Sequence, residues 1–179
     1  MLKIKNKLSF FVILTILHCS SGYNLYSQDN SASLNSNIYA TILTKKPGDL
    51  YSIQKLIDLN FGVIAVTSSS GSFSINPQTN VSTSTGGVVP QPSLRTRAEF
   101  LVKGKQNQPF TISVNQSSIV LQNTQNSANT VTVNLTNFSI GYFSNVGEAH
   151  FYVGGTLNVD ANQPKGTYTG TFVVNLNNN

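Results

Sequence analysis

The side chains that could support acid–base or metal chemistry are few and widely spaced in this 179-residue chain. Catalysis needs a nucleophile beside a base, a pair of carboxylates or a metal cage. The P-loop, GxSxG and HExxH motifs are all lacking. We therefore predict that the protein is not an enzyme and has no catalytic, cofactor-binding or metal-binding residues, and no cofactor. Its six carboxylates form no acidic cluster: Asp29, Asp49, Asp58, Glu99, Glu148 and Asp160.

Three short segments near the C-terminus resemble ligand sites but have simpler structural interpretations. His150 lies in an alternating segment, and the mature chain holds no second histidine or cysteine, so we expect an outward strand residue rather than a zinc ligand. Asp160-Ala161-Asn162 lacks the acidic density of a calcium loop. No helical pattern follows Gly154-Gly155, which predicts a tight bend or a close approach of two backbones rather than a phosphate loop.

Aromatic and basic residues are the remaining candidates for a binding surface. The tyrosines either form an exposed platform for carbohydrate or cap the edges of the core, and the absence of tryptophan favours the second. The basic residues form scattered pairs rather than a dense stripe, so we interpret them as solvated loop and strand-edge charges and predict no nucleic-acid partner. These residues are Tyr39, Tyr51, Tyr142, Tyr152 and Tyr168, and the pairs Lys45-Lys46, Arg95 with Arg97, and Lys103 with Lys105.

Residues 1–27 have the pattern of a secretory signal peptide. Three lysines precede an apolar run over residues 8–17, and small and polar residues follow. The run is too short to span a bilayer as a helix, so we predict no membrane span in the mature chain and an extracytoplasmic location in a bacterium: periplasmic, cell-surface or secreted. Cleavage is possible after Ser21, Gly22 or Ser27, of which we favour Ser27. Cys19 stands in a weak lipoprotein-like box with His18 where a small residue is expected.

Removing this segment changes the charge of the chain. The formal charge of +5 includes three of the eleven basic residues, so eight remain against six acidic ones and the mature chain is near +2. Only 9% of the residues are charged, and Asn, Ser, Thr and Gln supply most of the polarity. Such neutral polar surfaces suit an extracytoplasmic scaffold or fibre.

The clearest structural pattern lies in residues 150–176. Residues 156–160 and 167–176 alternate apolar and polar side chains, which is typical of half-buried strands. Between them, Pro164 and Gly166 supply turn chemistry. We predict two antiparallel strands joined by a short loop.

The same period of two recurs upstream. A polar arm over residues 28–36 precedes a strand at 37–43, and residues 45–49 carry a turn signal. Loops are expected at 68–71, 80–92 and 123–129, and residues 53–57 could form one helical turn. The spacing predicts an all-β fold: a single immunoglobulin-like antiparallel β-sandwich domain over residues 37–179, preceded by the signal peptide. Further strands are expected at 51–57, 59–66, 72–76, 98–102, 109–114, 118–121, 130–135, 138–143 and 149–153.

The C-terminal segment VGGTLNVDANQPKGTYTGTFVVNLN resembles the signature of a secreted bacterial family known only as domain of unknown function 4402. Weaker similarities lie at Leu59-Asn60-Phe61-Gly62 and at residues 98–104. The resemblance implies the fold but no activity, and it extends loosely to pilus and spore-coat domains. The matching positions are Val153, Gly154, Gly155, Leu157, Val159, Ala161, Gln163, Gly166, Tyr168, Gly170, Phe172 and Val174.

Two functions are compatible with these features. The first is a structural or adhesive cell-surface protein, fimbria-like, which self-associates by strand addition or contacts other cell-surface components. In that case residues 37–43 either complete a neighbour's sheet or form the domain's own first strand. The alternative is a monomeric binding module for carbohydrate or another surface polymer.

Overall fold

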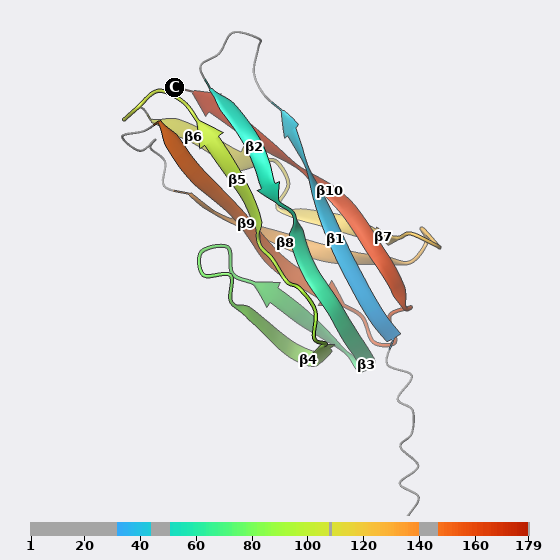
Figure 1. Ribbon diagram of the computed structural model, residues 1–179. Coiled ribbons are helices and arrows are strands. Elements are labelled where there is room, and N and C mark those ends of the chain that lie inside the picture. The colour runs from blue at the N-terminus through green and yellow to red at the C-terminus, as the bar shows by residue number, and fades with distance from the viewer. Residues whose placement is uncertain (1–31, 44–50, 108, 140–146, 179) are drawn as a thin grey trace, which may run out of the picture.

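All the regular secondary structure is β-strand in the part of the chain that the computed structural model describes, namely residues 32–43, 51–107, 109–139 and 147–178 (Figure 1). The all-β prediction is therefore confirmed, and residues 53–57 are strand rather than a helical turn. The predicted signal peptide and the turn at 45–49 lie outside these residues. The strands are β1 (Ala32–Leu43), β2 (Ser52–Ile57), β3 (Leu59–Ile75), β4 (Ser82–Pro90), β5 (Ala98–Lys103), β6 (Phe110–Val114), β7 (Ser118–Asn123), β8 (Thr130–Ser139), β9 (Glu148–Val159) and β10 (Gly166–Asn178).

The hydrogen-bonded strands close into a ring, so the prediction of a sandwich of two separate sheets is wrong. The sheet order is β2-β5-β9-β8-β7-β10-β1-β3-β4, and an additional pairing of β9 with β3 joins six of these strands into a closed circle. β2 and β5 extend from β9, β4 extends from β3, and β6 pairs with β10. Closing a sheet on itself removes free edges from the strands of the ring.

The ring closes because β3 changes its partner halfway along. Residues 59–66 pair with β1, whereas residues 71–75 pair with β9. Between the two halves, residues 67–70 bulge out opposite Gly87, where a Cβ would run into Ser69 O and Thr67 Oγ1. We expected loops at 68–71 and 80–92. Residues 68–71 belong mostly to this bulge within β3. Residues 80–92 contain β4, because the glycines in this segment permit a close approach to the backbone of β3 and do not form a turn.

β9 changes its partner in the same way, at Gly154. Residues 148–153 pair with β5 and residues 155–159 pair with β3, while β8 runs along the opposite edge. A Cβ on Gly154 would overlap Ile75 O and lie 2.9 Å from Pro77 N, so the predicted close approach of backbones is confirmed, without a bend. β9 and β10 do not pair with each other, so the predicted hairpin is wrong. Alternation identified both strands but not their partners.

β1 lies between the C-terminal strand and β3. It pairs with β10 in parallel and with β3 antiparallel, and it runs beside β10 along one side of the molecule (Figure 1). The fold is therefore not purely antiparallel. Leu34, Ser36 and Ile38 are completely buried, so residues 32–36 belong to the domain and not to the flexible arm that we predicted over residues 28–36.

Phenylalanine rings make up much of the core inside the ring. Phe61 and Phe73 meet edge to face with centroids 6.2 Å apart, and both come from β3. Phe100 of β5 contacts Phe151 of β9 at 6.0 Å and Phe172 of β10 at 6.2 Å. The contact of Phe100 with Phe172 therefore joins β5 to β10, two strands that are not hydrogen-bonded to each other.

Candidate functional site

The residues with acid–base chemistry lie apart, on the outer surface. His150 is an exposed strand residue, as expected, and its Nδ1 lies 2.7 Å from Glu99 Oε1 on the neighbouring strand. Two surface ion pairs occupy four more of the charged groups, Lys55 with Asp58 and Lys103 with Glu148. Among the described residues no three His, Cys, Asp or Glu side chains gather to hold a metal ion. Asp29 and Asp49 lie outside these residues.

The tyrosines that the structure describes do not assemble into a platform. Tyr168 is fully buried, whereas Tyr39 is half exposed. Tyr152 stacks against His150 at 6.0 Å on one side, and the Arg97 guanidinium lies 3.6 Å from its ring centroid. Tyr142 lies outside the described residues. We expected the basic residues to be solvated, and this is wrong for Arg97. Besides contacting the Tyr152 ring, its guanidinium donates a hydrogen bond to the main-chain oxygen of Pro77.

Buried hydrogen bonds explain the glutamine and the tyrosine of the C-terminal signature. The Tyr168 hydroxyl donates to Pro164 O at 2.7 Å and accepts from Gln163 Nε2 at 2.9 Å. Gln163 Nε2 also donates to Thr130 O at 3.2 Å. A tyrosine that reaches back to the main chain a few residues upstream is a recurring device in β-sandwich domains. The signature therefore encodes the connection from β9 into β10, with Gly166 at a φ of 147°.

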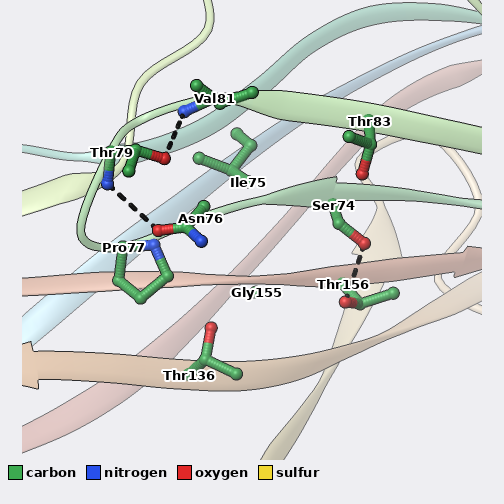
Figure 2. Close-up of a pocket in the computed structure, with 10 residues that line it drawn as sticks. All are labelled: Ser74, Ile75, Asn76, Pro77, Thr79, Val81, Thr83, Thr136, Gly155 and Thr156. Carbon is green, nitrogen blue, oxygen red and sulfur yellow. Dashed lines mark hydrogen bonds between the residues drawn. The ribbon is translucent and has the colours of Figure 1, made fainter.

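A cavity of about 490 Å³ lies where four strands meet near the end of β3. Hydroxyl groups from β3, β4, β8 and β9 face it, namely Ser74, Thr83, Thr136 and Thr156. Figure 2 shows the Thr83 hydroxyl pointing toward Ser74, whose Oγ lies 2.9 Å from Thr156 Oγ1, and the Thr136 hydroxyl pointing toward the turn at Asn76 and Pro77. Apolar contact surface comes from Ile75, Pro77 and Val81. None of the described residues that line this cavity has an ionisable side chain.

The turn over residues 76–81 forms one wall of the cavity and is held in place by its own hydrogen bonds. Asn76 Oδ1 accepts from the N–H of Gln78 at 2.8 Å and of Thr79 at 3.0 Å. Asn80 adopts a positive φ of 59°, and its Oδ1 accepts from Arg97 N at 2.9 Å. Arg97 also donates to Pro77 O at 2.6 Å. The wall is therefore ordered before any ligand arrives.

A second cavity of about 410 Å³ lies on the other side of Thr136. Its walls are Val114, residues 115–117 and residues 135–137, again without an ionisable side chain. Gln116 Oε1 accepts from Val173 N at 3.0 Å, which leaves its amide nitrogen without a partner among the described residues. Thr136 lines both cavities, so they are adjacent.

The first cavity lies at one end of an uncharged face that crosses five strands. Outward residues of β4, β3, β9, β8 and β7 stand opposite one another in register. Ser72 Oγ and Thr85 Oγ1 lie 2.9 Å apart on this face. Its two rows are Thr83, Ser74, Thr156, Asn134 and Ser118, and then Thr85, Ser72, Asn158, Thr132 and Val120.

Sequence reasoning did not find these hydroxyl residues. Serine and threonine are common along the whole chain, so no single one carries a signal. Only the register of β3, β4, β8 and β9 brings Ser74, Thr83, Thr136 and Thr156 together. The turn signals at Pro77 and Asn80 could have placed one wall, but not the strands that face it.

Comparison with known proteins identifies the family. Residues 51–178 match the family described as "Domain of unknown function (DUF4402)", so the chain belongs to it. The match begins after β1. No curated protein and no solved structure matches the chain. The described residues contain no helix with the length and apolarity that a membrane crossing requires.

Proposed function

We propose that the protein is secreted and acts, without catalysis, as a structural or adhesive component of the bacterial cell surface, in a fimbria-like manner. The sequence pattern of residues 1–27 supports export, and the looser resemblance to pilus and spore-coat domains agrees with a structural role. The observation that carries the proposal is the exposed, uncharged edge of β4.

The edge of β4 is open to another chain. β4 is the last strand of the sheet path and pairs only with β3 among the described residues. Its regular part, residues 82–85, consists of exposed serines and threonines. Natural edge strands usually carry charges or irregularities that prevent pairing. The other terminal strand, β2, has both, since it contains Lys55 and a register shift.

Self-association in which residues 37–43 add a strand to the sheet of a second copy is less favoured than pairing at the edge of β4. β10 already occupies one edge of β1 along residues 34–43, and β3 occupies the other edge along residues 32–38. These residues are accordingly the domain's own first strand in the monomer. The edge of β4 needs no such rearrangement, because a second copy can pair with it antiparallel about a twofold axis.

The test is the mass of residues 28–179 in solution at increasing concentration, measured by sedimentation. We expect reversible dimers, because pairing about a twofold axis uses the same edge of both copies and closes at two chains. Ser84→Lys places a like charge on both copies of the paired edge, so it should hold the protein as a monomer. Thr132→Lys on the interior strand β8 is the matched control and should assemble like the unmodified chain.

A chain that stays monomeric at every concentration would contradict self-association. The second candidate, a monomeric binding module for carbohydrate or another surface polymer, would then take precedence. The two adjacent uncharged cavities beside Thr136 favour it.

A further inference from the structure

The polar groups around Thr136 have the chemistry of a site for an uncharged, hydroxyl-rich ligand. The hydroxyls of Thr83 and Thr136 make no hydrogen bond to other described residues, and neither does the amide nitrogen of Asn76. Hydroxyls both donate and accept, whereas the amide nitrogen donates. Among the described residues, no cation or carboxylate lines either cavity to bind an oppositely charged group.

Apolar surface stands beside these polar groups. Val81 is 59% exposed at the rim of the first cavity, with Pro77 next to it. The C–H face of a sugar ring would cover such a surface while its hydroxyls reach the polar groups. A binding site typically combines apolar walls with a few placed polar groups in this manner.

The site is also pre-organised and elongated. The Asn76–Val81 wall is held by the Asn76 side chain and by Arg97, so little conformational entropy is lost on binding. Because Thr136 belongs to both cavities, a ligand of several units can occupy the first cavity and continue into the second.

We propose that the two cavities form one groove that binds an uncharged oligosaccharide chain, with Thr136 contacting the ligand between them. This inference rests on the proposed adhesive function and names the class of polymer that the protein contacts. Ser74, Thr83 and Asn76 would bind one sugar unit, and the amide side chain of Gln116 would bind the next.

The experiment is a titration of the isotope-labelled protein followed by backbone amide NMR. The probes are cellohexaose, maltohexaose, mannohexaose and the hexamer of N-acetylglucosamine, with hexagalacturonate as the anionic comparison, each at millimolar concentration. The Ser84→Lys variant is used throughout, so that self-association does not contribute to the spectra. At least one neutral hexamer should shift the amides of residues 74–83, 116, 136 and 156, and hexagalacturonate should not.

Two hydroxyl variants and a matched control test the contacts. Thr136→Val and Ser74→Ala should each weaken the binding of that hexamer by about fivefold, the effect of one lost hydrogen bond. Thr132→Val lies on the same strand and face but outside both cavities, and should bind within about twofold of the parent. A dispersed amide spectrum verifies that each variant is folded.

The proposal is overturned if no neutral hexamer perturbs these amides, if the shifts lie elsewhere on the molecule, or if hexagalacturonate binds better. Unchanged affinity in both Thr136→Val and Ser74→Ala would overturn it as well. None of these results depends on the sedimentation of the unmodified chain. The NMR titration can therefore disprove oligosaccharide binding without affecting the proposal of self-association, and sedimentation can disprove self-association without affecting the proposal of oligosaccharide binding.

Discussion

At the scale of single residues, the family signature describes folding positions rather than ligand contacts. Leu157, Phe172 and Val174 are completely buried, and Gly154 and Gly166 stand where a side chain would collide with its surroundings. Most of the residues facing the first cavity, Ser74, Thr83 and Thr136 among them, lie outside the signature. A match to the signature therefore identifies the fold and leaves the ligand undetermined.

Tyr168 is a completely buried residue whose hydroxyl makes two hydrogen bonds. Tyr168→Phe removes the hydroxyl and leaves Pro164 O and one N–H of Gln163 without that partner. Because these groups are buried or partly buried, we expect a loss of about 1–3 kcal/mol in the free energy of unfolding. Urea denaturation of both proteins measures the difference.

Tyr39→Phe is the control for this substitution. Tyr39 is 46% exposed, so removal of its hydroxyl should leave the urea midpoint nearly unchanged. Equal midpoints for the Tyr168→Phe variant and the unmodified protein would show that the hydrogen bonds of the β9–β10 connection contribute nothing to stability.

At the scale of elements, two long strands determine the architecture by changing partners. β3 passes from β1 to β9, and β9 passes from β5 to β3. Each change falls at glycine: Gly154 in β9, and Gly71 of β3 facing Gly86 of β4. The same partner changes place the end of β3 beside β8 and β9, where the first cavity lies.

Gly154→Ala tests the partner change in β9. The new Cβ would overlap Ile75 O and approach Pro77 N, and these are main-chain atoms that cannot rotate away. We expect a loss of about 1–3 kcal/mol in the free energy of unfolding, the usual cost of overpacking. Chemical denaturation provides the value.

Gly170→Ala in β10 is the comparison. Its Cβ would lie 2.6 Å from Leu121 Cδ2, the end of a flexible side chain, and 3.1 Å from Val120 O. We expect this variant to lose less stability than Gly154→Ala. The reverse order would mean that the close approach at Gly154 is not what requires a glycine there.

At the scale of the whole molecule, β1 completes the ring although the family match begins after it. Its residues Leu34, Ser36 and Ile38 are completely buried between β10 and β3. Without β1, the ring has two open edges and its core faces water. The first strand is thus a structural requirement of the domain in this chain.

Deletion of residues 28–43 should therefore abolish cooperative folding. We expect the shortened chain, residues 44–179, to lose its dispersed amide spectrum and its sigmoidal thermal transition, because hydrophobic burial is lost across the ring. A synthetic peptide of residues 28–43 added in excess should restore both signals. A shortened chain that melts like the full domain would show that β1 is dispensable.

The sequence alone determined most of the strands and their buried faces, because alternation of apolar and polar side chains is a local property of a pleated strand. It did not predict β4, which lies in a segment that we expected to be a loop. Ala98, Phe100 and Val102 are an example, predicted on one face and all completely buried. The C-terminal signature also indicated the family, and the lack of motifs argued against an enzyme.

Only the tertiary structure decided which strands pair and which side chains converge. Many of these strands have similar patterns, and a pattern of period two does not specify a neighbour. The ring, the parallel pairing of β1 with β10 and the separation of β9 from β10 are therefore visible only in the tertiary structure. Ser74 and Thr156 meet although 82 residues separate them, because the register of β3 on β9 brings their hydroxyls together.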